Sequence, residues 1–134
     1  MRFTLTIILT FMVPLTACLA DLRPVPYRVP RVESGQASWY GPGFHGRLTA
    51  SGEVYDMYDL TAAHPALPFG TTLRVTDLVS GRSVIVRIND RGPFIGRRVL
   101  DLSYAAADRL GIVHDGLAQV RMEPLEKQLL QLSI

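Results

Sequence analysis

The sequence has few of the residues that build covalent cross-links or metal centres. Among 134 residues there is one cysteine, Cys18, so no disulfide can form within the chain. The three histidines, His45, His64 and His114, are widely spaced, and no second cysteine accompanies them. Tetrahedral zinc sites need four such ligands at short spacings, so we expect neither a metal nor another cofactor.

Strong charge and several common catalytic motifs are also missing. The formal net charge is +2, which is far from the basic surplus of a nucleic-acid-binding domain, so we expect no nucleic-acid partner. There is no phosphate-binding loop, no serine nucleophile motif and no C-x-x-C pair.

The first seventeen residues, "MRFTLTIILTFMVPLTA", have the pattern of an export signal. One basic residue precedes an apolar run that has signal-peptide length but is too short and too poorly flanked to span a membrane permanently. The segment ends in "LTAC", which resembles a bacterial lipobox, and this predicts that Cys18 carries the lipid anchor. The alternative is an incidental leader cysteine. Because Leu19 rather than aspartate follows, we expect an envelope protein anchored in the outer membrane and facing the periplasm.

Residues 18–34 are expected to form a lipidated tether. Prolines at positions 24, 26 and 30 interrupt the segment, and its apolar residues show no usable periodicity. In extended polyproline geometry such a tether would reach roughly 50 Å from the lipid. Residues 35–125 are predicted to form one folded domain, followed by a short C-terminal tail at 126–134.

The predicted domain consists of short alternating runs separated by Gly, Pro and Asp, which favours a small β-barrel or sandwich. Strands are expected in "GQASWYG", "TTLRVTDL", "RSVIVRIND", "RRVLDL" and "LAQVRMEPL", with Gly81 in the turn of the central hairpin. The segment "SYAAADRLG" predicts a single helix, capped by Ser103 and ended by Gly111.

Asp90 lies at the end of an apolar row. Counting by twos from Val84 through Val86 and Ile88 places Asp90 on the core side of its strand. A carboxylate there must be paired, hydrogen-bonded or partly protonated, because burying a bare charge is expensive. The residue is therefore either part of a structural turn or a working acid.

Glu53, His64 and Arg91 are further candidates, each with a structural alternative. Glycoside cleavage requires a proton donor, which makes carboxyl groups the first residues to consider. Glu53 lies in a Gly-rich loop beside Tyr55, where taken alone a solvated position is favoured. His64 either orients a carboxylate or holds a loop, and spacing alone favours the loop. Arg91 either pairs with a substrate carboxylate or locks the turn after Asp90.

Three aromatic residues cluster in "SWYGPGFHG". This segment is too rich in Gly and Pro to bury Trp39, Tyr40 and Phe44 together in regular structure, and flat aromatic faces suit the apolar faces of sugar rings. We therefore expect the loop to line a glycan groove. For Trp39, a position as a core anchor at a strand end is an equal alternative.

Four segments taken together resemble the rare lipoprotein A family of bacterial cell-envelope proteins. They are "ASWYGPGFHGRLTASGEVYD", "LTAAHPALPFGTTLRVTDL", "VIVRINDRGPF" and "RRVLDLSYAAADRLG", in the family's order and with similar gaps. The resemblance covers about residues 35–123. It implies a mainly β fold, a six-stranded double-psi β-barrel with one short helix.

The resemblance also implies an activity and a set of site residues. Enzymes of the family are lytic transglycosylases, which cleave the bond between N-acetylmuramic acid and N-acetylglucosamine in peptidoglycan and leave a 1,6-anhydro ring. Their catalytic acid and base falls on Asp90, with Glu53 and His64 as the accompanying motif residues. Peptidoglycan strands are the implied partner, and we expect a monomer. The expected substrate-binding residues are Trp39, Tyr40, Phe44, Tyr55 and Arg91.

Two readings follow from the resemblance, since some barrels of this kind bind polysaccharide without cleaving it. One is a lytic transglycosylase, and the other is a non-catalytic wall-binding lipoprotein. Larger family members add a C-terminal repeat that binds glycan strands stripped of peptides, whereas this chain ends ten residues after Pro124. We therefore expect no such module here.

Overall fold

The structure, a computed structural model, describes residues 32–125. The expected leader, Cys18, the tether up to residue 31 and the tail at 126–134 lie outside this range. The described part contains six strands and one short helix. In chain order they are β1 (Glu33–Trp39), β2 (Thr61–Ala63), β3 (Thr72–Asp77), β4 (Ser83–Asp90), β5 (Arg98–Leu102), α1 (Tyr104–Leu110) and β6 (Leu117–Pro124).

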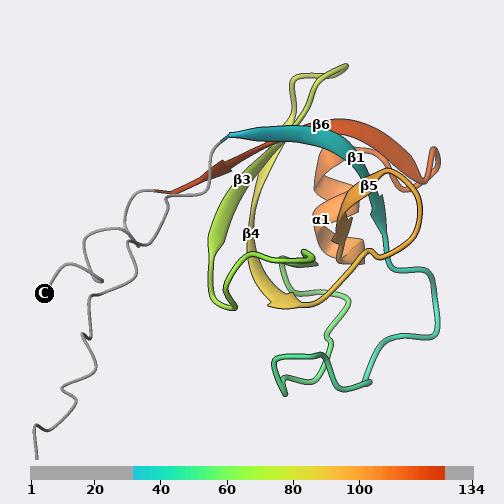
Figure 1. Ribbon diagram of the computed structural model, residues 1–134. Helices are drawn as coiled ribbons and strands as arrows, with labels where there is room; N and C mark the ends of the chain where they lie inside the picture. The colour runs from blue at the N-terminus through green and yellow to red at the C-terminus, as the bar shows by residue number, and fades with distance from the viewer. Residues whose placement is uncertain (1–31, 126–134) are drawn as a thin grey trace, which may run out of the picture.

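The six strands close into a barrel in the order β1-β5-β2-β4-β3-β6, with β6 pairing back to β1 (Figure 1). Strands β1 and β5 are parallel, as are β2 and β4, while the remaining neighbours are antiparallel. Closure removes unpaired strand edges, which suits a small isolated sheet. The expected mainly β fold, a closed six-stranded barrel with one short helix, is confirmed.

The barrel interior is filled by small and branched apolar side chains from every strand. Helix α1 joins this core because Ala106, Ala107 and Leu110 lie on one helical face and are buried. Its ends match the sequence prediction: the Ser103 hydroxyl accepts from the Ala106 N–H, and Gly111 has a left-handed φ of 77°. The largest fully buried apolar side chains are Leu73, Val75, Val86, Ile88, Leu100, Leu102, Leu110 and Val120.

Two strands differ from the expectation based on alternation. Strand β1 begins at Glu33, two residues before the predicted domain start at Gly35. The predicted strands did not include β2, which has only three residues, two of them alanine. It exists because parallel β4 and antiparallel β5 flank it and satisfy its backbone groups. Tertiary pairing, rather than β-propensity, determines this strand.

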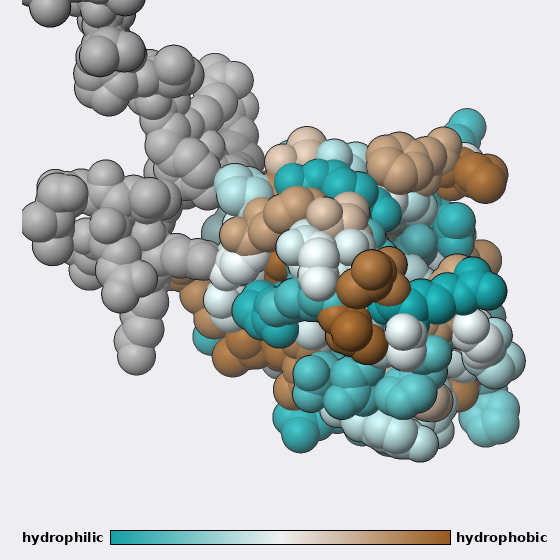
Figure 2. Space-filling view, turned by 90° about the horizontal axis from the view of Figure 1, so that it is seen from below, coloured by the Kyte–Doolittle hydropathy of each residue, from teal (hydrophilic) through white to brown (hydrophobic). Residues whose placement is uncertain are grey.

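The long connection between β1 and β2, residues 40–60, lies on one side of the barrel, below it in Figure 1. Strands β1 and β4 both end toward this side, so the loop begins directly after Trp39 and comes close to Asp90 at the end of β4. Figure 2 shows this face, on which hydrophobic side chains stand among hydrophilic ones. Across residues 32–125, no helix has the length and apolar character needed to cross a membrane.

Candidate active site

Strand β4 ends in a bulge that reorients its last residues. Ala62 of β2 pairs with Ile88, but the next residue, Ala63, pairs with Asp90, so Asn89 is an additional residue in β4. Simple alternation placed Asn89 on the outer side and Asp90 toward the core. Instead Asn89 is buried, at 3% exposure, and Asp90 is half-buried at the rim of the barrel. The bulge therefore turns the Asp90 carboxyl group out of the core and toward the 40–60 loop.

Three donors hold the carboxyl group of Asp90. Its Oδ1 accepts from the Ala50 N–H at 2.9 Å and from the Arg91 N–H at 2.8 Å. Its Oδ2 accepts from the Tyr40 hydroxyl at 2.8 Å. Of the alternatives that the sequence left open, the structure shows the hydrogen-bonded one. Tyr40 and Ala50 both belong to the 40–60 loop, so the orientation of the carboxyl group depends on the folded loop.

Asp90 opens onto a cavity of about 330 Å³ between the barrel rim and the loop. Eight residues line it: Tyr40, Phe44, Arg47, Leu48, Thr49, Tyr55, Asp90 and Arg91. Five of them were predicted from the sequence as site residues. Arg47, Leu48 and Thr49 were not, although the "RLTASG" motif that precedes Glu53 contains them.

Three aromatic residues of the loop, Tyr40, Phe44 and Tyr55, form one packed group at the cavity. The Tyr40 ring lies 4.8 Å from the Tyr55 ring and 5.7 Å from the Phe44 ring, centroid to centroid. Tyr55 is only 4% exposed and packs its ring against that of Tyr40, whereas Phe44 is exposed. Burial, followed by the hydrogen bond to Asp90, raises the pKa of the Tyr40 hydroxyl well above its usual range. Tyr40 therefore remains a hydrogen-bond donor at any working pH.

Glu53 is fastened to strand β4 instead of lining the cavity. Both carboxylate oxygens accept from Arg87 Nη1, at 2.7 and 2.8 Å. The hydrogen bond from Arg87, with a second from the Asn89 side chain, lowers the pKa of Glu53. Glu53 is therefore ionised and paired at neutral pH, on a loop that also supplies the Ala50 N–H to Asp90.

His64 is buried directly after β2, and its ring holds the next turn. Its Nδ1 accepts from the N–H groups of Ala66 and Leu67, each at 3.0 Å. Its backbone N–H donates to the Asp90 carbonyl at 3.2 Å. Burial lowers the pKa of the imidazole, so the ring is neutral at pH 7. His64 thus adjoins Asp90 through the backbone, and its side chain supports the loop.

Arg91 also lines the cavity while fastening the segment after His64. Its guanidinium donates to the Leu67 carbonyl at 2.7 Å and lies 3.9 Å from the centroid of the Phe69 ring. These contacts favour the turn-locking role that the sequence had left as one of two alternatives. Within residues 32–125, no group of three potential metal-ligating side chains comes together.

Residues 32–122 match the family described as "Lytic transglycolase", whose domain is a double-psi β-barrel. The chain belongs to this family. The matched region includes the whole barrel up to Met122 and every site residue described above. The resemblance to rare lipoprotein A inferred from four sequence motifs is thereby confirmed.

Bacterial relatives of this lytic transglycolase domain are similar over most of the chain. The endolytic peptidoglycan transglycosylase RlpA of Vibrio cholerae is 52% identical over 108 residues, covering 77% of this chain and 41% of that protein. RlpA of Pseudomonas aeruginosa (strain PAO1) is 56% identical over 92 residues, covering 69% of this chain and 27% of that protein. The chain therefore spans less than half the length of these relatives.

Solved structures that resemble the domain agree on the fold. A Streptomyces papain inhibitor has a TM-score of 0.59 at 22% identity, covering 72% of this chain and 96% of that one. An expansin from Clavibacter michiganensis has a TM-score of 0.57 at 21% identity, covering 71% of this chain and 50% of that one. At such identities the likeness concerns the barrel alone.

Proposed function

We propose that this domain is a peptidoglycan lytic transglycosylase in which Asp90 is the general acid and base. The observation that carries the proposal is the Asp90 carboxyl group, which three donors hold at the edge of a cavity lined by aromatic rings. A positioned carboxyl group is what glycosidic-bond cleavage requires, and aromatic faces suit sugar rings. The names of the relatives, endolytic peptidoglycan transglycosylases, support the same chemistry.

The proposed reaction uses one carboxyl group twice. Protonated Asp90 donates its proton to the oxygen that bridges N-acetylmuramic acid and N-acetylglucosamine, and the bond from that oxygen to muramyl C1 breaks. The C6 hydroxyl oxygen of the same muramyl sugar then bonds to C1, and its proton passes to the Asp90 carboxylate. The enzyme regains its starting state, no water is consumed, and the products are a new N-acetylglucosamine end and a 1,6-anhydromuramyl end.

Glu53 and His64 serve this reaction by positioning. Glu53 is ion-paired with Arg87 and is thus unsuited to donate a proton, but it anchors the loop whose Ala50 N–H holds Asp90. The neutral ring of His64 fixes the turn after β2, and its backbone bonds to Asp90. Neither side chain lines the cavity that Asp90 faces.

Digestion of purified sacculi, followed by mass spectrometry of the soluble fragments, tests this proposal. The wild-type domain should release fragments with 1,6-anhydromuramyl ends, while Asp90→Asn should lose on the order of a hundredfold or more in rate. The variant should fold, because the asparagine oxygen can still accept from Ala50 and Arg91. Sacculus binding without any anhydro product from the wild type would instead establish the non-catalytic wall-binding protein.

We further propose that the protein acts as a lipoprotein attached to the envelope through Cys18. The support is the "LTAC" motif after an apolar leader, together with the absence of any other cysteine. A lipidated N-terminal cysteine carries more than one acyl chain, which is sufficient for stable anchoring. The leucine after the cysteine favours the outer membrane, and the peptidoglycan substrate favours its periplasmic face.

A further inference from the structure

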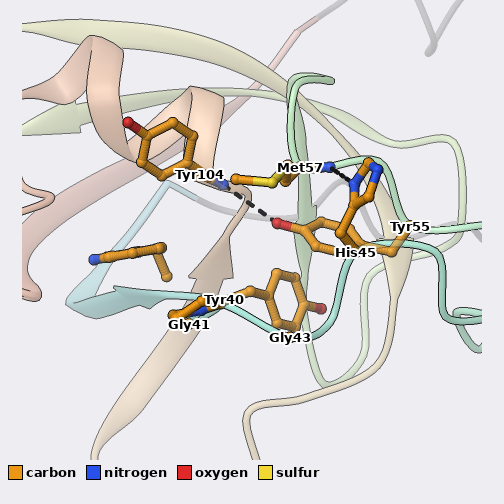
Figure 3. A pocket seen from close by; sticks show the side chains of 9 residues that line it. Tyr40, Gly41, Gly43, His45, Tyr55, Met57 and Tyr104 are labelled. Carbon is orange, nitrogen blue, oxygen red and sulfur yellow. Dashed lines mark hydrogen bonds between the residues drawn. The ribbon is translucent and has the colours of Figure 1, made fainter.

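A second cavity, of about 160 Å³, lies beside the Asp90 cavity (Figure 3). Tyr40 and Tyr55 line both cavities, so these two rings form the partition between them. The rest of its wall includes Trp39, Met57 and Tyr104, and the Gly41-Pro42-Gly43 backbone forms one side. The family comparison gives no role to this second cavity, and the proposed reaction at Asp90 does not use it.

The second cavity is apolar, and the fold already uses most of its few polar atoms. The Nδ1 atom of His45 accepts from the Met57 N–H at 3.1 Å. The Tyr55 hydroxyl oxygen accepts from the Tyr104 N–H at 3.3 Å, as Figure 3 shows. Within the described residues, the hydrogen of that hydroxyl has no acceptor. The cavity therefore offers mainly apolar walls with a few polar groups, and the Tyr55 hydroxyl is one hydrogen-bond donor among them.

An acetamido group has the complementary chemistry, because it carries one methyl group and one strong carbonyl acceptor. Trp39 adds a large aromatic face, and its edge-to-face contact with Tyr104 at 5.6 Å fixes the orientation of the indole. A glycan that is cut within its length must continue past the reacting sugar. The cavity that adjoins the Asp90 cavity is a place where the next sugar can lie.

We propose that this second cavity is a subsite for an N-acetylated sugar next to the one at Asp90, with the acetamido methyl group against Trp39 and Met57. The proposal rests on the proposed function, since it assumes an N-acetylated glycan at Asp90. It adds a specificity element: the domain selects glycans that carry acetamido groups over glucans of the same linkage.

Trp39 provides a direct readout, because it is the only tryptophan of the chain and lines this cavity. Titration with the β-1,4-linked tetramer of N-acetylglucosamine should change the tryptophan emission and saturate. Cellotetraose has the same linkage but no acetamido groups. It should bind at least about fourfold more weakly, because that is the affinity ratio that corresponds to the free energy of burying one methyl group. Equal affinity for the two tetramers would overturn the proposal.

Gly41→Leu tests the site without disturbing the core. Gly41 has no positive φ, and a Cβ placed there would meet no heavy atom within 4 Å, so the variant should fold normally. Its side chain should obstruct the cavity and weaken tetramer binding, as should Met57→Ala, which removes apolar wall. Val79→Leu is the matched control, since Val79 is 91% exposed in the β3–β4 hairpin, on the opposite side of the barrel in Figure 1, and should bind like wild type.

The outcomes separate this proposal from the proposed function. If the wild type releases anhydro products from sacculi but its Trp39 emission does not respond to the tetramer, the subsite is absent and the activity stands. If both Gly41→Leu and Met57→Ala bind the tetramer like wild type, the subsite is likewise refuted. If the emission responds and both variants weaken it, but no anhydro product forms, the subsite stands and the transglycosylase function fails.

Discussion

The hydrogen bond from the Tyr40 hydroxyl to the Asp90 carboxyl group links the ends of two strands, because Tyr40 follows β1 and Asp90 ends β4. The hydroxyl remains protonated, since burial and the neighbouring carboxyl group both raise its pKa. It donates to Oδ2 and leaves the other lone-pair direction of that oxygen for a substrate atom. In the proposed mechanism, Tyr40 thus positions the Asp90 carboxyl group in addition to presenting an aromatic face.

Tyr40→Phe should therefore affect turnover more than binding. The change removes only the hydroxyl, so the ring contacts with Tyr55 and Phe44 remain and KM should stay near wild type. A hydrogen bond to a charged group is worth about 1.5 kcal/mol or more, so we expect kcat to fall about tenfold. Steady-state release of anhydro fragments measures both values. Tyr58→Phe, the same change at a residue that is 70% exposed, is the control and should leave kcat unaltered.

His64 predicts a pH dependence of stability. Its folded-state pKa lies below the unfolded value because of burial, and its Nδ1 must be unprotonated to accept from Ala66 and Leu67. The stabilisation is complete above the unfolded pKa of about 6.5 and is lost as the pH falls through the lower folded value. Denaturant unfolding between pH 7.5 and 4.5 should show this loss.

Two variants isolate the contribution of His64. His64→Asn places an acceptor oxygen near the position of Nδ1 and cannot titrate, so it should keep most stability at pH 7.5 and show a weaker pH dependence. His64→Ala removes the acceptor and should cost about 1–3 kcal/mol at pH 7.5. Identical pH profiles for wild type and His64→Asn would show that another group is responsible.

At the scale of single residues, the sequence pointed to five of the eight residues that line the Asp90 cavity but did not predict what they contact. Asp90 was found because a charge ended an apolar row, but the bulge at Asn89 depends on pairing with β2 and is invisible to local alternation. Glu53 was predicted as a catalytic residue, yet its partner Arg87 lies 34 positions away. Distant pairings of this kind have no local signature.

Among the elements, the small hairpin around residues 47–54 connects loop and barrel. Leu48 and Val54 form an antiparallel bridge, and the Thr49 N–H donates to the Glu53 carbonyl at 2.8 Å. From this hairpin, Glu53 reaches Arg87 and Ala50 reaches Asp90. The ion pair with Arg87, together with the hydrogen bond from the Ser51 N–H to the Asn89 carbonyl at 3.3 Å, therefore fastens the hairpin that carries the Ala50 donor to β4.

Arg87→Met should reduce activity more than stability. The pair with Glu53 is partly exposed, and such pairs contribute less than about 1 kcal/mol, so the melting temperature should change little. The freed hairpin should hold Asp90 less well, and we expect kcat to fall severalfold. Arg121→Met breaks a comparable exposed pair with Glu123 in β6 and is the control for activity. Equal activity of the two variants would contradict the proposal that Glu53 positions the loop at Asp90.

Elements with strong local signals were predictable, whereas those defined by pairing were not. The helix carries its own caps at Ser103 and Gly111, and the β3–β4 hairpin carries Gly81 at a φ of 74°. The three residues of β2 have no such signal and become a strand only between β4 and β5. The resemblance, and not alternation, supplied the sixth strand.

For the molecule as a whole, we propose that Cys18, which lies outside the described residues, determines the position of the barrel in the cell. If Cys18 carries the lipid, Cys18→Ser should release the protein from the membrane fraction while the purified domain keeps its sacculus-digesting activity. Fractionation with immunodetection measures the release, and digestion of sacculi measures the activity. Metabolic labelling with a fatty-acid analogue shows whether Cys18 carries the lipid. A Cys18→Ser protein that is processed normally and stays in the membrane fraction would contradict the lipoprotein proposal.

The interleaved strand order has a consequence for how the chain folds. Strand β1 pairs with β5 and β6, so it cannot complete its backbone hydrogen bonds until the end of the domain is available. The Ser38 hydroxyl of β1 donates a hydrogen bond to the Asp101 carboxylate of β5, and these two residues lie 63 positions apart. Contacts of such sequence separation slow folding from microseconds toward milliseconds or seconds. A chain still emerging from a ribosome can pair β3 with β4, but it cannot close the barrel until its last strand has appeared.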